Sequence, residues 1–149
     1  WLCVVDVDHF KRVNDSFGHL FGDEVLILVA NLLRSCFGSQ HRVFRFGGEE
    51  FVVLLHPMSL EDATRALEHF RCTVQDYDFP QVGRVTVSLG FSGAHMHAPS
   101  PTQLLSQADD ALYYAKENGR NRVCHYEGLQ ALGIFNKHEQ VTHDDVELF

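Results

Sequence analysis

Short apolar runs alternate with amphipathic stretches along the chain as far as residue 126. Short runs rich in β-branched and aromatic residues favour buried strands, whereas apolar residues that recur every three or four positions favour helices. This pattern predicts five strands, at residues 1–8, 41–46, 51–56, 83–92 and 121–126. It predicts four helices, at residues 10–18, 19–38, 59–77 and 102–119.

Capping residues set the limits of these helices. Gly18, Gly38 and Gly119 stand where three of the helical patterns stop, and glycine is the usual residue just past a helix end. Ser59 precedes the third helix as a candidate N-cap, and Asp62 follows three residues later in the place of a capping-box acid.

The predicted order is β-α-α-β-β-α-β-α-β, with one hairpin inside an otherwise alternating pattern. Such an order indicates one α/β (α+β) domain in which helices flank a central mixed, largely antiparallel five-stranded sheet. The 149 residues suffice for one domain with a full core and are too few for two such domains.

Composition and charge narrow the function classes. The chain has 45% apolar and 21% charged residues, as in an ordinary globular protein, and a net charge of −8. An acidic chain is a poor nucleic-acid binder, so we expect no nucleic-acid partner. The four cysteines form no C-x-x-C pair and no membrane span is visible, which favours a reducing, cytoplasmic location and leaves membrane anchoring of a longer parent protein open.

Acidic residues from two distant stretches are expected to meet at one edge of the sheet. Asp6 lies near the end of the first predicted strand, and Glu49 and Glu50 follow Gly47 and Gly48 in the hairpin turn. If the hairpin lies beside the first strand, the carboxylates of Asp6 and Glu49 converge and repel each other, and a divalent cation such as Mg²⁺ removes that repulsion. Alternatively, the glutamates are solvated turn residues. The glycines either leave room for a nucleotide or simply suit a tight turn.

Basic residues and a helix start offer places for an anion. The stretch Asp8-His9-Phe10-Lys11 runs into the first helix, whose free N–H groups favour phosphate. Lys116 and Arg120 lie at the end of the last helix, where they also suit the helix dipole. Asn14 and Asp23 match the hydrogen-bonding edge of guanine, although each could equally cap a helix.

Four stretches in order resemble the motifs of the GGDEF family of diguanylate cyclases: DVDHFKRVNDSFGHLFGDEVL, RFGGEEF, VSLGFS and ADDALYYAKENGRNRV. The resemblance runs from Trp1 to about Tyr126, and the signature turn Gly47-Gly48-Glu49-Glu50-Phe51 is the GGEEF variant. It implies a fold related to polymerase palms and nucleotidyl cyclases. It also implies the condensation of two GTP into cyclic di-GMP with release of two pyrophosphates.

The resemblance assigns catalytic roles to Asp6, Glu49 and Glu50. Asp6, Glu49 and the carbonyl of Val7 are the implied ligands of Mg²⁺ (or Mn²⁺), with two ions per active site. Glu50 is implied as a further metal ligand or as the group that helps to deprotonate the attacking 3′-hydroxyl.

The resemblance also implies which residues contact the nucleotide. Asn14 and Asp23 would hold guanine. The implied phosphate contacts are Lys11, Lys116, Arg120 and the amides around Asp8, His9 and Phe10. Each domain would carry half of the active site, so the implied partners are GTP, a second copy of the domain related by a two-fold axis, and an upstream sensory or receiver domain.

Three features depart from the family pattern. Residues 1–126 are expected to form the GGDEF domain without its usual N-terminal helix, which suggests a truncated start. Residues 127–149 are expected to form a C-terminal extension that packs on the domain or is disordered. Gly38 and His41 replace the Arg and Asp of the inhibitory R-x-x-D motif, so no inhibitory site is expected.

His95 and His97 form an H-x-H in a loop, interpreted as solvated and not as a metal site.

Two alternatives to an active cyclase remain. One is a catalytically silent GTP-binding regulatory module, although degenerate members usually lose acidic residues that this chain keeps. The other is a related cyclase that uses a different purine, against which Asn14 and Asp23 argue.

Overall fold

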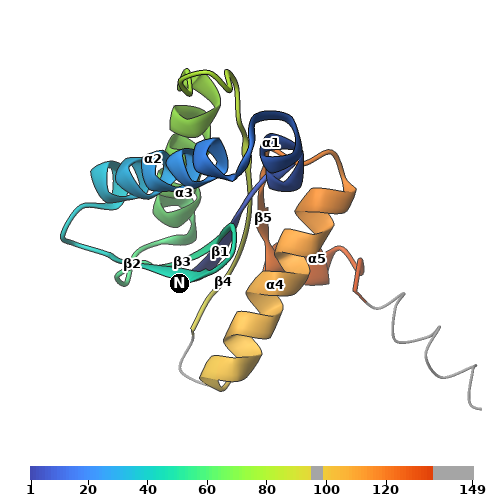
Figure 1. Ribbon diagram of the computed structural model, residues 1–149. Coiled ribbons are helices and arrows are strands. Elements are labelled where there is room, and N and C mark those ends of the chain that lie inside the picture. The colour runs from blue at the N-terminus through green and yellow to red at the C-terminus, as the bar shows by residue number, and fades with distance from the viewer. Residues whose placement is uncertain (95–98, 136–149) are drawn as a thin grey trace, which may run out of the picture.

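The computed structural model describes residues 1–94 and 99–135, and the histidines His95 and His97 lie outside them. Figure 1 follows the chain through five strands and five helices. They are β1 (Leu2–Val7), α1 (Phe10–Phe17), α2 (His19–Phe37), β2 (Arg42–Gly47), β3 (Glu50–Leu54), α3 (Leu60–Asp76), β4 (Val87–Ser92), α4 (Pro101–Glu117), β5 (Val123–His125) and α5 (Tyr126–Ala131). Every helix among these residues is too short or too polar to cross a membrane.

The strands form one mixed sheet in the order β2-β3-β1-β4-β5. β1 lies in the middle and pairs antiparallel with both β3 and β4, while β4 and β5 are parallel. The predicted α+β architecture with a five-stranded, largely antiparallel sheet is therefore confirmed. Since β1 and β4 are buried along their whole length, a residue that ends β1 is held rigidly.

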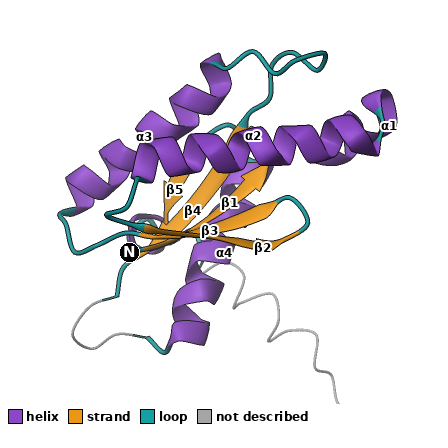
Figure 2. Cartoon of the chain, turned by 60° about the vertical axis from the view of Figure 1, so that its left-hand side comes forward, coloured by secondary structure: helices purple, strands orange, loops and turns teal. Residues whose placement is uncertain are grey.

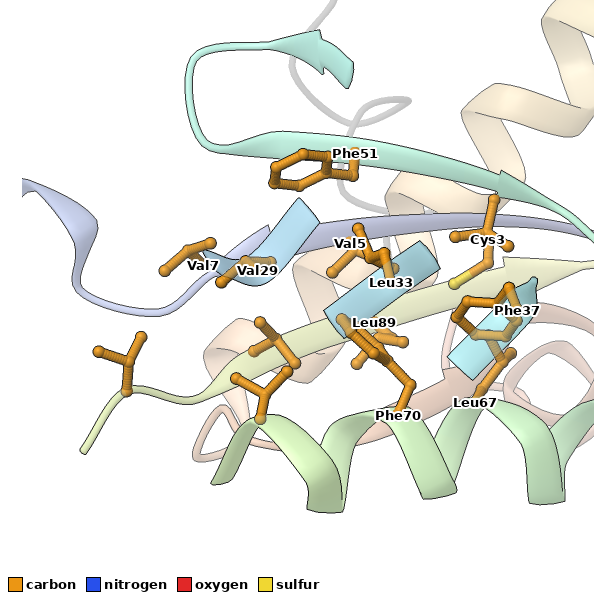
Figure 3. Close-up of a cluster of buried hydrophobic side chains, with 14 of the residues drawn as sticks. Cys3, Val5, Val7, Val29, Leu33, Phe37, Phe51, Leu67, Phe70 and Leu89 are labelled. Atoms are coloured by element: carbon orange, nitrogen blue, oxygen red, sulfur yellow. The ribbon is translucent and has the colours of Figure 1, made fainter. Parts of the chain in front are cut away.

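Helices cover both faces of the sheet. Figure 2 shows α2 and α3 over one face and α4 against the other. Alternate residues of β1 serve the two faces, because side chains point to opposite sides along a strand. Cys3, Val5 and Val7 join the core under α2 and α3 (Figure 3), whereas Leu2 and Val4 pack against α4. Asp6 continues the second set, so its position in the strand directs its side chain to the α4 side.

A glycine lets α4 lie close to the sheet. A Cβ on Gly90, in β4, would lie 2.1 Å from the backbone nitrogen of Leu112 and 2.3 Å from the carbonyl oxygen of Ala108. Both atoms belong to the backbone of α4, so the helix would have to move to admit any side chain there. Gly90 thereby sets the distance of α4, and of Lys116 at its end, from the middle of the sheet.

The structure differs from the sequence-based prediction mainly at the ends of elements. β4 begins at Val87 and not at residue 83, because residues 79–83 form a tight turn closed by a bond from the Gly83 amide to the Phe79 carbonyl. Helix α5 was not predicted. The predicted cap of α3 is confirmed, since the amide of Asp62 donates to Ser59 Oγ at 3.1 Å.

Candidate active site

Strand register brings the predicted acids together. Asp6 in β1 lies directly opposite Glu50 in β3, and the amide of Val7 donates to the carbonyl of Glu49 at 3.3 Å. Residues directly opposite on antiparallel strands have Cβ atoms about 5 Å apart and share one face of the sheet. The carboxylates of Asp6 and Glu50 therefore belong to the same edge and the same face, the one that α4 covers.

The signature turn is held from the β2 side. Gly48 adopts φ +48°, in the left-handed region that favours glycine, and a register shift marks the strand between Arg45 and Gly47. The guanidinium of Arg45 donates to the carbonyl of Gly48 through Nη2 at 2.9 Å and Nε at 3.3 Å. Sequence reasoning missed this role of Arg45, which fixes the turn just before its two glutamates.

Asp6 is the buried carboxylate of the site and Lys116 is its partner. Only 5% of Asp6 is exposed, and Lys116 Nζ at the end of α4 lies 2.9 Å from Asp6 Oδ2. Burial raises the pKa of Asp6 to about 6, against the opposing effect of Lys116, and the neighbouring Glu49 and Glu50 raise it further. The site thus holds more negative charge than one lysine neutralises.

Two further acids stand beside this edge. A pocket of about 360 Å³ is lined by Glu50, Asp109, Asp110 and Lys116, among others. Burial raises the pKa of Asp109, and the charges of Glu50 and Asp110 add to the effect. Asp109 and Asp110 were not predicted as site residues, although they precede Lys116 by about two helical turns, a spacing visible in the sequence.

Asp8 has a different surrounding from Asp6. Its buried carboxylate accepts hydrogen bonds from Ser88 Oγ at 2.6 Å, Thr86 Oγ1 at 2.7 Å and the amide of Asn121 at 3.0 Å. Its own amide donates to the Thr86 carbonyl. Asp8 therefore ties β4 and the loop after α4 to the start of α1, and its amide is engaged within the fold.

The predicted phosphate-binding amides that remain available lie in the first turn of α1. His9 precedes the helix in a left-handed conformation, with φ +56° and no side-chain cap, and the first amides of a helix have no partner within it. The amides of His9, Phe10 and Lys11 lie in this turn. The Lys11 ammonium is exposed and lies 3.3 Å from Asp15 Oδ2, in a surface pair that is easily exchanged for another anion.

The predicted guanine contacts lie on two neighbouring helices. Asn14 is on α1 and Asp23 is on α2, which pack together next to Gly18. A Cβ on Gly22 would lie 1.8 Å from Oδ1 of Asn14. Because Gly22 has no side chain, the side chain of Asn14 can lie against α2 at this point. Gly22 immediately precedes Asp23, so Asn14 lies near the start of the segment that carries Asp23. This role of Gly22 was not predicted.

Arg120 follows α4 in a strained loop. It has φ +59°, and its amide donates to the carbonyl of Ala115 at 2.9 Å. Its own carbonyl accepts a bond from Arg122 Nε at 3.2 Å. Together with the Asn121–Asp8 bond, these contacts hold the Arg120 loop close to the start of α1.

The positions of the missing inhibitory motif lie at the far end of α2. Gly38 caps α2 with φ +57°. Nδ1 of His41 accepts a bond from the amide of His56 at 3.2 Å. Neither residue supplies a guanidinium or a carboxylate there.

The acidic side chains of the site suit a divalent metal ion, although they are not already arranged as a metal centre. Within residues 1–94 and 99–135, no three His, Cys, Asp or Glu side chains are gathered as a metal centre. Asp6 and Glu50 nevertheless supply oxygen donors on the same face of one sheet edge, and the charge of Glu49 is near enough to raise the pKa of Asp6. Mg²⁺ needs only one or two carboxylates when water and phosphate complete its shell, so these residues fit the ion.

Comparison with known proteins supplies the family. Residues 1–122 match the family described as "Diguanylate cyclase, GGDEF domain". The chain belongs to the GGDEF domain family. The match covers β1 to the loop before β5, and so includes every acidic and basic residue of the site described above.

Relatives of this GGDEF domain include named cyclases. The chain is 39% identical to diguanylate cyclase A of Treponema denticola over 126 residues, covering 82% of this chain and 34% of that protein. It is 44% identical to diguanylate cyclase DgcM of Escherichia coli over 122 residues, covering 82% and 30%. The chain thus spans about a third of the length of these curated relatives.

Solved structures agree with the fold. The active GGEEF domain of a diguanylate cyclase from Vibrio cholerae superposes with a TM-score of 0.78 at 37% identity, covering 84% of this chain and 81% of that one. The GGDEF domain of DgcB from Caulobacter crescentus, in complex with c-di-GMP, gives 0.79 at 34% identity, covering 85% and 77%.

Proposed function

We propose that this GGDEF domain is a diguanylate cyclase that condenses two GTP into cyclic di-GMP. Each 3′-hydroxyl attacks the α-phosphate of the other GTP, and each attack breaks the bond between the α-phosphate and the bridging oxygen, so that two pyrophosphates leave. The observation that carries the proposal is the meeting of Asp6, Glu50 and Lys116 at one sheet edge, in a chain that keeps both turn glutamates.

The chain's own residues position the nucleotide. Asn14 and Asp23 receive the guanine base. Lys11, Arg120 and the first amides of α1 hold the phosphates, and Lys116 exchanges part of its contact with Asp6 for a phosphate oxygen. Phosphoryl transfer depends mainly on such positioning and on stabilising charge, so these groups account for much of the rate.

The acids complete the chemistry. Asp6, Glu49 and the carbonyl of Val7 are the proposed ligands of Mg²⁺, with Mn²⁺ as a substitute and two ions per site. Such ions would lower the pKa of the attacking hydroxyl and neutralise charge on the pyrophosphate. Glu50 is proposed to accept the proton of the 3′-hydroxyl or to bind the second ion, which its position opposite Asp6 in the register supports.

Catalysis requires two copies of the domain. One domain holds one GTP, so two domains must face each other with two-fold symmetry, each presenting its 3′-hydroxyl to the other's nucleotide. An upstream sensory or receiver domain in a longer parent protein would control this encounter. Product inhibition through an R-x-x-D site is proposed to be weak or absent, because Gly38 and His41 occupy its positions.

A direct assay tests the proposal. Protein held as a dimer, by its parent chain or a fused leucine zipper, is incubated with Mg²⁺ and GTP and the products are separated by chromatography. Cyclic di-GMP is expected from the native sequence and none from Glu50→Ala. GTP binding without turnover in the enforced dimer would instead establish the alternative, a silent GTP-binding regulatory module.

A further inference from the structure

A second pocket lies between α4 and the segment that follows β5. It has a volume of about 630 Å³, within the size range of small-molecule sites. Four aromatic side chains line it: Tyr113 and Tyr114 from α4, Tyr126 from α5 and Phe135 beyond it. The rings of Tyr126 and Phe135 stack at 4.8 Å between centroids with an angle of 18°, so together they form one continuous wall.

The charge of this pocket has one sign. Asp110 and Glu117 line it, and none of its described lining residues is Lys, Arg or His. The pocket therefore combines aromatic rings, whose faces carry negative electrostatic potential, with two carboxylates. The carboxylates would repel an anionic ligand and would offer a neutral ligand only hydrogen bonds, whereas a cation would be attracted by both features.

The two acids do not form a metal centre of the usual kind. Among the residues that the structure describes, no three His, Cys, Asp or Glu side chains are grouped so that they could hold a metal ion. Asp110 and Glu117 are seven residues apart on one helix, a rise of about 10 Å, so their carboxylates are spread along the pocket and not gathered at one point. A larger, weakly hydrated cation can contact rings and carboxylates together.

We propose that this pocket binds a small organic ammonium ion, with the aromatic rings around its alkylated nitrogen and Asp110 or Glu117 neutralising its charge. The pocket adjoins the one beside Glu50, since Asp110 and Tyr113 line both, but none of the proposed nucleotide or metal contacts lines it. The proposal does not depend on cyclase activity, because it concerns binding to the chain alone.

Choline and its neutral isostere 3,3-dimethyl-1-butanol test the proposal, because they differ in charge while keeping nearly the same shape. Each is titrated into the full 149-residue chain and followed by NMR. Choline is expected to bind at least about fivefold more tightly, with the largest shifts at α4 and α5. Equal affinity for the two compounds would show an apolar cavity with no preference for cations, and the proposal would be wrong.

Two variants and a control locate the site. Glu117→Gln, in an exposed side chain, and Phe135→Leu are each expected to weaken choline binding by about three- to tenfold. Asp78→Asn removes one exposed negative charge elsewhere and is expected to leave binding unchanged. If Asp78→Asn weakened choline binding as much as Glu117→Gln while Phe135→Leu left it unchanged, the effect would reflect net charge and not the pocket, which would overturn the assignment.

Discussion

Replacing Asp6 with Asn is expected to stabilise the fold while abolishing the proposed activity. Asp6 is 5% exposed, and burial together with Glu49 and Glu50 raises its pKa from 3.8 to about 6 despite the nearby Lys116. A difference of about two pKa units corresponds to about 3 kcal/mol of unfavourable free energy for the charged form in the folded state. Asn keeps the shape and removes the charge, but also loses the contact with Lys116, so we expect a gain of about 1–3 kcal/mol.

The sign of the pH dependence follows from the raised pKa. The folded state takes up the Asp6 proton near pH 6, whereas the unfolded state takes it up near 3.8. The wild type therefore gains stability from this group as the pH falls from 7 towards 4, and the variant does not. The advantage of Asp6→Asn is expected to be complete above about pH 7 and to vanish near pH 4.

Urea unfolding between pH 4 and pH 8 in EDTA measures this difference, with Asp78→Asn as a control whose exposed side chain should change little. Addition of Mg²⁺ is expected to stabilise the wild type and not the variant, because the variant lacks a proposed ligand. If Asp6→Asn were less stable than the wild type at pH 8 without metal, the pair with Lys116 would outweigh the cost of burial, and the reasoning would be refuted.

Three further changes test the surroundings of the site. Gly90→Ala is expected to destabilise the fold by about 2 kcal/mol or more in urea unfolding, because its Cβ would strike the backbone of α4; unchanged stability would mean that α4 does not lie so close. Gly22→Ala is expected to displace Asn14 and weaken GTP binding several-fold in calorimetry with little change in Tm, and unaltered affinity would reject the guanine role of Asn14. Glu127→Gln is expected to cost about 1–2 kcal/mol at pH 7, after allowance for its partial exposure. Burial alone would raise the pKa of Glu127, but bonds from His125, the Gly93 amide and Ser92 lower it to about 2. The stability lost on this substitution should therefore shrink as the pH falls from 4.5 towards 2. A loss of stability that does not depend on pH would contradict this.

The spacing of apolar residues predicted the long helices and strands, because each of them buries either one face or its whole length. The regular apolar spacing of α2 and α3, and the β-branched run of β1, leave little choice of secondary structure. Helix α5 escaped prediction because it is six residues long and has no apolar repeat of its own. It depends on tertiary contacts, including two hydrogen bonds to Glu127 Oε1, from Ser92 Oγ and the Gly93 amide.

The sequence indicated which residue types belong to the candidate site, but it did not show which of these residues contact one another. A strand-end Asp and a glutamate-rich turn indicate a shared edge, but only the register shows that Glu50 lies opposite Asp6. The contact between Asp6 and Lys116 joins residues 110 positions apart in sequence, and no local pattern encodes it. Arg45 and Gly22 act on a backbone carbonyl and on a neighbouring side chain, contacts that require three-dimensional positions.

The measurement closest to the central claim is the stoichiometry of the reaction in an enforced dimer. The 149-residue chain fused to a leucine zipper is incubated with Mg²⁺ and GTP, and cyclic di-GMP and pyrophosphate are counted together. Two pyrophosphates for each cyclic di-GMP are expected, with neither product from the matched Glu50→Ala dimer. Saturable GTP binding with no cyclic di-GMP, or pyrophosphate without cyclic product, would contradict the assignment of this domain as a diguanylate cyclase.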